Sequence, residues 1–150
     1  MNGQCLRTIG LVAALALALP AQAAGDLTAG EPIRISVRLG TTDGLHRFVP
    51  DTLAFETGKL YALRIDNPGK HDHYFGSQGF ADAVYSRKAV VLDASGRDLV
   101  QVYGPVRRFE LEAGSSMEWW FVPVRAGIFE DLRSTRTHDE AGMKGRIEVR

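Results

Sequence analysis

Short segments in which apolar and polar residues alternate are the feature that most constrains how this chain can fold. Residues 33–39 (IRISVRL) alternate at every second position, and residues 108–112 and 145–150 repeat the pattern. Successive side chains of a strand point to opposite faces, so such segments predict strands with one buried face. Turn-forming residues such as Asn67-Pro68-Gly69 lie between them.

Further strands are predicted by apolar runs bounded by turn residues, at 52–55, 60–65, 89–92, 99–103 and 117–124. One short helix is expected at 80–85, where Phe80, Ala83 and Val84 share a helical face. Short strands at this spacing, seven or more in number, predict an all-β antiparallel sandwich or barrel with one short helix.

Composition excludes some classes of protein. Hydrophobic residues make up 45% of the 150 residues, which is enough for a packed core in one domain. Eighteen basic and eighteen acidic side chains give a formal net charge of zero. A nucleic-acid-binding protein normally has a basic excess, so we expect no nucleic-acid partner.

The N-terminus has the pattern of a secretory signal peptide over residues 1–23. Arg7 supplies the positive charge, residues 9–19 are uncharged and mostly apolar, and Ala21-Gln22-Ala23 suits signal peptidase. A short membrane anchor is the alternative interpretation, although the run is shorter than the roughly 20 residues of a membrane span. We therefore expect a domain at 24–150, without a membrane span, that is periplasmic or secreted.

Cysteine usage restricts the chemistry of that domain. Cys5 is the one cysteine of the sequence, and it lies within the predicted signal peptide. The exported chain would then have no disulfide and no thiolate to offer a metal ion.

Histidines provide the candidate metal ligands. His71 and His73 follow the Asn67 turn with one residue between them, so in an extended segment both project from one face. His138 precedes Met143 by five residues in a polar segment. Imidazole suits copper and zinc, whereas a thioether selects copper. Taken by spacing alone, these residues also fit a solvated turn, a surface histidine and a core methionine. His46 stands apart and is interpreted as structural or exposed.

Several longer segments carry a resemblance to a known family. They are Phe48-Val49-Pro50, Gly58-Lys59-Leu60-Tyr61, Asn67-Pro68-Gly69-Lys70, residues 118–123 (EWWFVP) and residues 138–145 (HDEAGMKG). Over about residues 48–150 the chain resembles the cupredoxins, specifically the small periplasmic copper proteins similar to plastocyanin and azurin. The resemblance implies a Greek-key β-sandwich.

The resemblance to the cupredoxins also implies which residues are metal ligands. The family's histidine and methionine ligands fall on His73, His138 and Met143, and its cysteine position falls on Arg133. A blue-copper site uses two histidines, a thiolate and a weak axial methionine, and a guanidinium cannot replace the thiolate. His71 is a candidate substitute ligand. On this alignment, Arg133→Cys is expected to create the intense blue-copper absorption.

The function predicted first is a copper-binding protein of the periplasm, for copper transport, buffering or other handling, without a blue-copper thiolate. The first alternative is a metal-free interaction module in which Arg133 fills the former site, and the second is an electron-transfer cupredoxin. No hydrolase motif or phosphate-binding loop is present in the sequence, so we do not expect an enzyme. Copper ion and a periplasmic protein are the expected partners.

Overall fold

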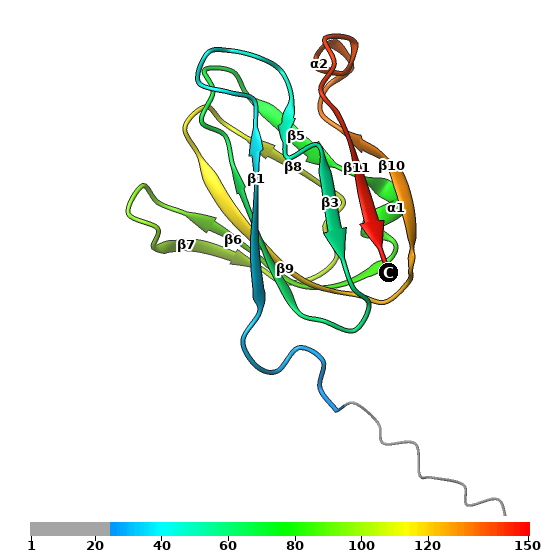
Figure 1. The fold of residues 1–150 in the computed structure, drawn as a ribbon. Coiled ribbons are helices and arrows are strands. Elements are labelled where there is room, and N and C mark those ends of the chain that lie inside the picture. The colour runs from blue at the N-terminus through cyan, green and yellow to red at the C-terminus, as the bar shows by residue number, and fades with distance from the viewer. Residues whose placement is uncertain (1–24) are drawn as a thin grey trace, which may run out of the picture.

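The structure is a computed structural model that describes residues 25–150, in which two β-sheets pack face to face (Figure 1). The predicted signal peptide lies outside the described residues. The first sheet has six strands. Their order is β2 (Phe48–Val49), β1 (Ile33–Leu39), β4 (Tyr61–Asp66), β9 (Ser116–Pro123), β6 (Val84–Leu92) and β7 (Asp98–Val102).

The second sheet has five strands. Their order is β3 (Thr52–Phe55), β11 (Lys144–Val149), β10 (Gly127–Arg133), β5 (His73–Gly76) and β8 (Arg108–Leu111). Strand pairs β1–β4 and β3–β11 are parallel, and the other pairs are antiparallel. Parallel neighbours cannot be joined by a hairpin and need a longer crossover connection, so the topology is not a simple meander. The predicted all-β fold class is confirmed.

Most predicted strands occur within one or two residues of their expected bounds, but the helical segments differ. The predicted helix at 80–85 is instead α1 (Gln78–Ala81), which Ser77 caps by accepting a hydrogen bond from the Phe80 backbone N–H. Val84 already begins a strand. A second short helix, α2 (Arg136–Glu140), lies between β10 and β11 and was not predicted.

Strand β10 was also not predicted, and a register shift explains why. Its pairing with β11 is irregular between Phe129 and Leu132. A bulge of this kind interrupts the alternation of side chains along a strand. The sequence pattern of residues 127–133 is therefore weaker than that of a regular half-buried strand.

Aromatic side chains form the centre of the core between the two sheets. Phe80 is fully buried, and its ring lies 5.2 to 5.7 Å from the rings of Phe55, Trp119 and Phe121. Aromatic rings at such separations stabilise a core through burial and favourable edge-to-face packing. The core holds the strand ends in place, and the segments that join them carry the candidate site. Within residues 25–150, no helix has the length and apolarity that crossing a membrane requires.

Candidate metal centre

Three chain segments meet at one end of the sandwich, which is the upper end in Figure 1. One segment joins β1 to β2 and carries His46. Another joins β4 to β5 and carries His71, while His73 is the first residue of β5. The segment between β10 and β11 contains α2 with His138, followed by Met143.

Three histidines converge where these segments meet. One ligand nitrogen from each of His46, His73 and His138 can be chosen so that all lie within 4.8 Å of one another. The Nδ1 atoms of His73 and His138 are 3.3 Å apart. The rings of His46 and His138 stack with their centroids 4.2 Å apart. His73 is only 2% exposed, so the cluster is sheltered from solvent on its inner side.

Gly40, directly after β1, allows His73 to approach the backbone. A Cβ atom at position 40 would lie 2.5 Å from His73 Nε2, which is closer than any real contact. Gly40 also has a φ of +75°, in the left-handed region that glycine adopts without a steric penalty. Two independent constraints therefore require glycine at this position.

Asn67 fixes the turn before His73. This side chain is 1% exposed, and its Nδ2 donates to the carbonyl oxygens of His71 and Leu111 at 2.9 and 2.8 Å. Its Oδ1 accepts from the Gly69 N–H at 3.1 Å. All the polar groups of a buried amide are thus used to hold the turn, which positions the histidine segment against β8.

The first turn of α2 positions His138. Thr135 caps the helix, because its Oγ1 accepts a hydrogen bond from the His138 backbone N–H at 3.2 Å. After the helix, the Met143 N–H donates to the His138 carbonyl at 2.9 Å. Met143 is fully buried and belongs to the core cluster. The predicted pair of His138 and Met143 is thus joined by a short, hydrogen-bonded loop.

Burial and the neighbouring imidazoles lower the pKa values of His73 and His138. Burial lowers the pKa of His73 from 6.5 to about 4, and the nearby His138, His46 and His71 lower it further. Burial also lowers the pKa of His138, with His46 and His71 adding to the effect. A neutral imidazole has a free lone pair, which is the form that binds a metal ion.

Ser134, and not Arg133, lies beside the histidines. Ser134 is 8% exposed, its Oγ accepts from the Tyr74 N–H at 3.0 Å, and it lies 3.4 Å from His138 Nδ1. The neighbouring Leu132 also points inward, with no exposed surface. Side chains alternate along this chain segment, so Arg133 points to the outer face.

The Arg133 guanidinium is engaged on that outer face. It donates to the Leu132 carbonyl at 2.8 Å and lies 3.7 Å from an Asp139 carboxylate oxygen. Its side chain is 39% exposed and lines two surface pockets. The guanidinium therefore pairs with a carboxylate and does not fill the space between the histidines, as the metal-free alternative requires it to do.

The other two histidines lie at different distances from His73 and His138. His71, the candidate substitute ligand, is exposed at the rim, with its ring 5.7 Å from that of His46. His46, interpreted from the sequence as structural or exposed, belongs to the cluster. No local motif marks His46. Its signal is its position in the segment between β1 and β2, which becomes informative only when the strand order is known.

The cluster has two properties of a metal site. Two nitrogens bound to one ion at 2.0–2.1 Å with a tetrahedral angle lie about 3.3 Å apart, and this is the Nδ1 separation of His73 and His138. In addition, the buried Nδ1 atom of His46 has no hydrogen-bond partner among the described residues. A buried polar atom without a partner is costly, and a bound ion would satisfy it. The residues present fit a metal ion.

The close approach at Gly40 gives a matched pair of variants. Gly40→Ala and Gly44→Ala both place a side chain at positive φ, but only position 40 meets another atom within 4 Å. We expect both to lower the free energy of unfolding by about 1–2 kcal/mol from backbone strain. Only in Gly40→Ala should the free energy of unfolding fall by about 1–3 kcal/mol more, because the added methyl group overpacks against His73. It alone should shift the NMR signals of the His73 ring. Denaturant unfolding and imidazole NMR measure both effects, and equal results for the two variants would contradict the assigned contact.

The lowered pKa of His73 predicts a pH dependence for the metal-free protein. The unfolded chain binds a proton near pH 6.5, whereas folded His73 binds one only near pH 4. Stability from this group is therefore present above pH 6.5 and is lost as the pH falls through this window, by about 1–3 kcal/mol. Denaturant unfolding from pH 7 to 4 measures this loss. His73→Gln should flatten the profile and His71→Gln should not, so a profile that His73→Gln leaves unchanged would refute the assignment.

Comparisons with known proteins show which fold this is. No protein-family model and no curated protein matches the sequence. Among solved structures, dithionite-reduced auracyanin from Roseiflexus castenholzii aligns over 81% of this chain and 99% of its own, at 14% identity and a TM-score of 0.51. The McoA multicopper oxidase of Aquifex aeolicus aligns over 87% of this chain and 31% of its own, at 13% identity and a TM-score of 0.59.

A multi-copper oxidase from Pediococcus acidilactici aligns over 89% of this chain and 28% of its own, at 12% identity and a TM-score of 0.57. The chain therefore spans about a third of each oxidase and nearly the whole of the auracyanin. Identities this low support a common architecture only. Together with the two-sheet topology, they establish that residues 25–150 have a cupredoxin fold.

Proposed function

We propose that this is an exported, periplasmic copper-binding protein that transports, buffers or otherwise handles copper. Its ligands are His46, His73 and His138, with the Met143 thioether as a fourth donor. The observation that carries the proposal is the convergence of three imidazoles, two of which have lowered pKa values. Neutral imidazoles together with a thioether are a donor set that favours copper, particularly Cu(I).

The identity of residue 134 separates this function from that of a blue-copper electron carrier. A hydroxyl group beside His138 cannot provide the thiolate that gives a blue-copper centre its intense colour and electronic coupling. A site of nitrogen and thioether donors suits reversible binding of copper better than rapid electron transfer. His71, at the rim, is kept as an auxiliary ligand of the entering ion and not as a replacement for the thiolate.

The metal-free alternative loses its main support. That alternative requires Arg133 to fill the site, whereas its guanidinium is bound to Leu132 and Asp139 on the outer face. In addition, a metal-free module leaves the buried Nδ1 atom of His46 without a partner. A bound copper ion would give that atom a partner.

Copper titration of the purified protein tests the function. We expect one Cu(I) or Cu(II) ion to bind with a Kd below micromolar, and only weak visible absorption in the Cu(II) form. His46→Ala, His73→Ala and His138→Ala should each weaken binding by about 100-fold or more, because each removes a donor. His71→Ala is the matched control and should have a much smaller effect. Binding no tighter than micromolar for both oxidation states would refute the proposal.

Two cysteine variants distinguish position 134 from position 133. Ser134→Cys places a thiolate beside His138 and should give the copper-loaded protein an intense absorption band in the visible red. Arg133→Cys, expected from the alignment alone to do so, should remain weakly coloured because that side chain points outward. Visible absorption spectra of the two copper-loaded variants measure the difference. An intense band from Arg133→Cys, without one from Ser134→Cys, would overturn the assignment of these positions.

A further inference from the structure

A row of cations crosses four strands of the five-stranded sheet. Arg108 of β8 lies opposite Gly76 of β5, which in turn lies opposite Arg133 of β10. Arg133 lies opposite Lys144 of β11. Residues directly opposite each other in a sheet project from the same face, and like charges in such pairs are destabilising. Arg133 and Lys144 form such a pair, and a bound anion would offset their mutual repulsion.

The glycine in this row creates a notch between two arginines. Neighbouring strands lie about 4.8 Å apart, so the backbones of Arg108 and Arg133 are separated by about 10 Å. Gly76 contributes no side chain between them, and a Cβ atom there would lie 3.1 Å from Arg108 Cγ. The resulting pocket has a volume of about 200 Å³ and is lined by Arg107, Arg108 and Arg133 without any carboxylate.

The positive charge of the row is only partly neutralised. Arg107 pairs with Asp82 at 2.9 Å, but Arg133 has only the longer contact of 3.7 Å with Asp139. The Arg108 guanidinium stacks over the Tyr74 ring at 4.0 Å. Within residues 25–150, neither Arg108 nor Lys144 forms an ion pair. The row therefore retains a net positive charge on this face of the sheet.

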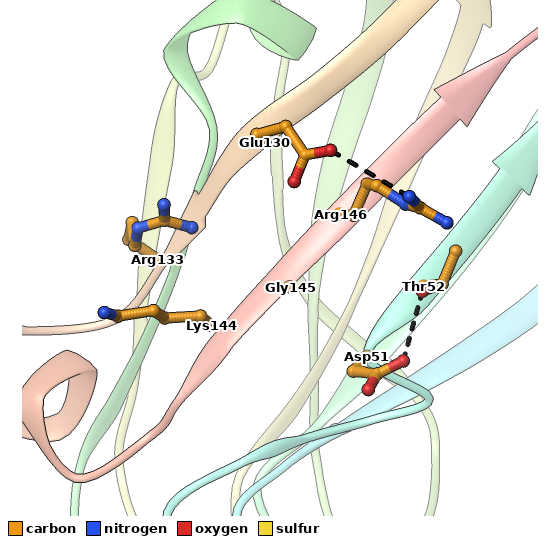
Figure 2. Close-up of a pocket in the computed structure, with 7 residues that line it drawn as sticks. All are labelled: Asp51, Thr52, Glu130, Arg133, Lys144, Gly145 and Arg146. Carbon is orange, nitrogen blue, oxygen red and sulfur yellow. Dashed lines mark hydrogen bonds and ion pairs between the residues drawn. The ribbon is translucent and has the colours of Figure 1, made fainter.

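The adjacent, larger pocket provides a contrast. It has a volume of about 310 Å³ and shares Arg133 and Lys144 with the row, but Asp51 and Glu130 also line it. Figure 2 shows Arg133 and Lys144 together on one side of this pocket, with Glu130 and Arg146 joined on the other. Carboxylates in its wall would repel an anion. The excess of positive charge is thus concentrated at the notch over Gly76.

We propose that the notch over Gly76 binds an oxyanion, either a carboxylate or a phosphate group, through the guanidinium groups of Arg108 and Arg133. Planar guanidinium groups form paired, charge-assisted hydrogen bonds with such groups. Ser134 also lines the notch, and its Oγ lies 3.4 Å from His138 Nδ1. The oxyanion is therefore held one side chain away from the histidine cluster, although its binding does not require a metal ion.

Inorganic phosphate is the first probe, titrated into the metal-free protein at low ionic strength by calorimetry and by NMR of the Gly76 amide. We expect saturable binding of one phosphate. Arg108→Gln and Arg133→Gln should each weaken it by about tenfold, through loss of charge-assisted hydrogen bonds. Gly76→Ala should weaken it similarly without removing a charge, because its Cβ fills the notch.

Arg97→Gln is the matched control, because it removes one positive charge from an exposed turn between β6 and β7 in the other sheet. It should leave phosphate binding unchanged. An aspartate-rich peptide forms a second arm of the experiment. Binding of the peptide but not of phosphate, with the same dependence on Arg108 and Arg133, assigns the oxyanion to the side chains of a partner protein. Absence of both kinds of binding, or binding that none of the three notch variants weakens, overturns the proposal.

Discussion

The histidine end of the sandwich depends on the packing of one buried imidazole against bare backbone. His73 begins a strand of one sheet, and Gly40 follows a strand of the other. The sheets approach this closely only because position 40 has no side chain. The segment after Gly40 then turns back, with the Gly40 N–H donating to the Arg47 carbonyl at 2.8 Å, and it carries His46 into the cluster. Without this contact, the first and second histidine segments would not meet.

Burial at this contact also determines the chemistry of the cluster. Removing His73 from solvent lowers its pKa, and the three nearby imidazoles of His138, His46 and His71 make a positive charge there still less favourable. The same arrangement that opposes protons leaves nitrogen lone pairs available to a metal ion. At the proposed site, a metal ion and protons would compete for the same nitrogens, so metal binding there would depend on pH.

Strand alternation separates two neighbouring residues into two different environments. Ser134 lies inward beside His138, whereas Arg133 lies outward in the row of cations that flanks Gly76. The inward residue of this pair is therefore a serine, which offers no thiolate to a metal ion. The outward residue is an arginine, which adds positive charge to the outer surface. The two proposed binding sites are adjacent, because Ser134 lies beside His138 and also lines the notch, but their ligands need not be related.

The sequence by itself determined the architecture and part of the site. Alternation and turn residues predicted most strands, and the resemblance to the cupredoxins placed candidate ligands at His73, His138 and Met143. Only the tertiary structure revealed His46, because its approach to the other histidines depends on which strands are neighbours. It also decided that Ser134, and not Arg133, faces the cluster. The reason is a bulge in β10, which shifts the alternation of side chains between the two faces of the sheet. After such a shift, the face that a side chain occupies cannot be predicted from residue spacing alone.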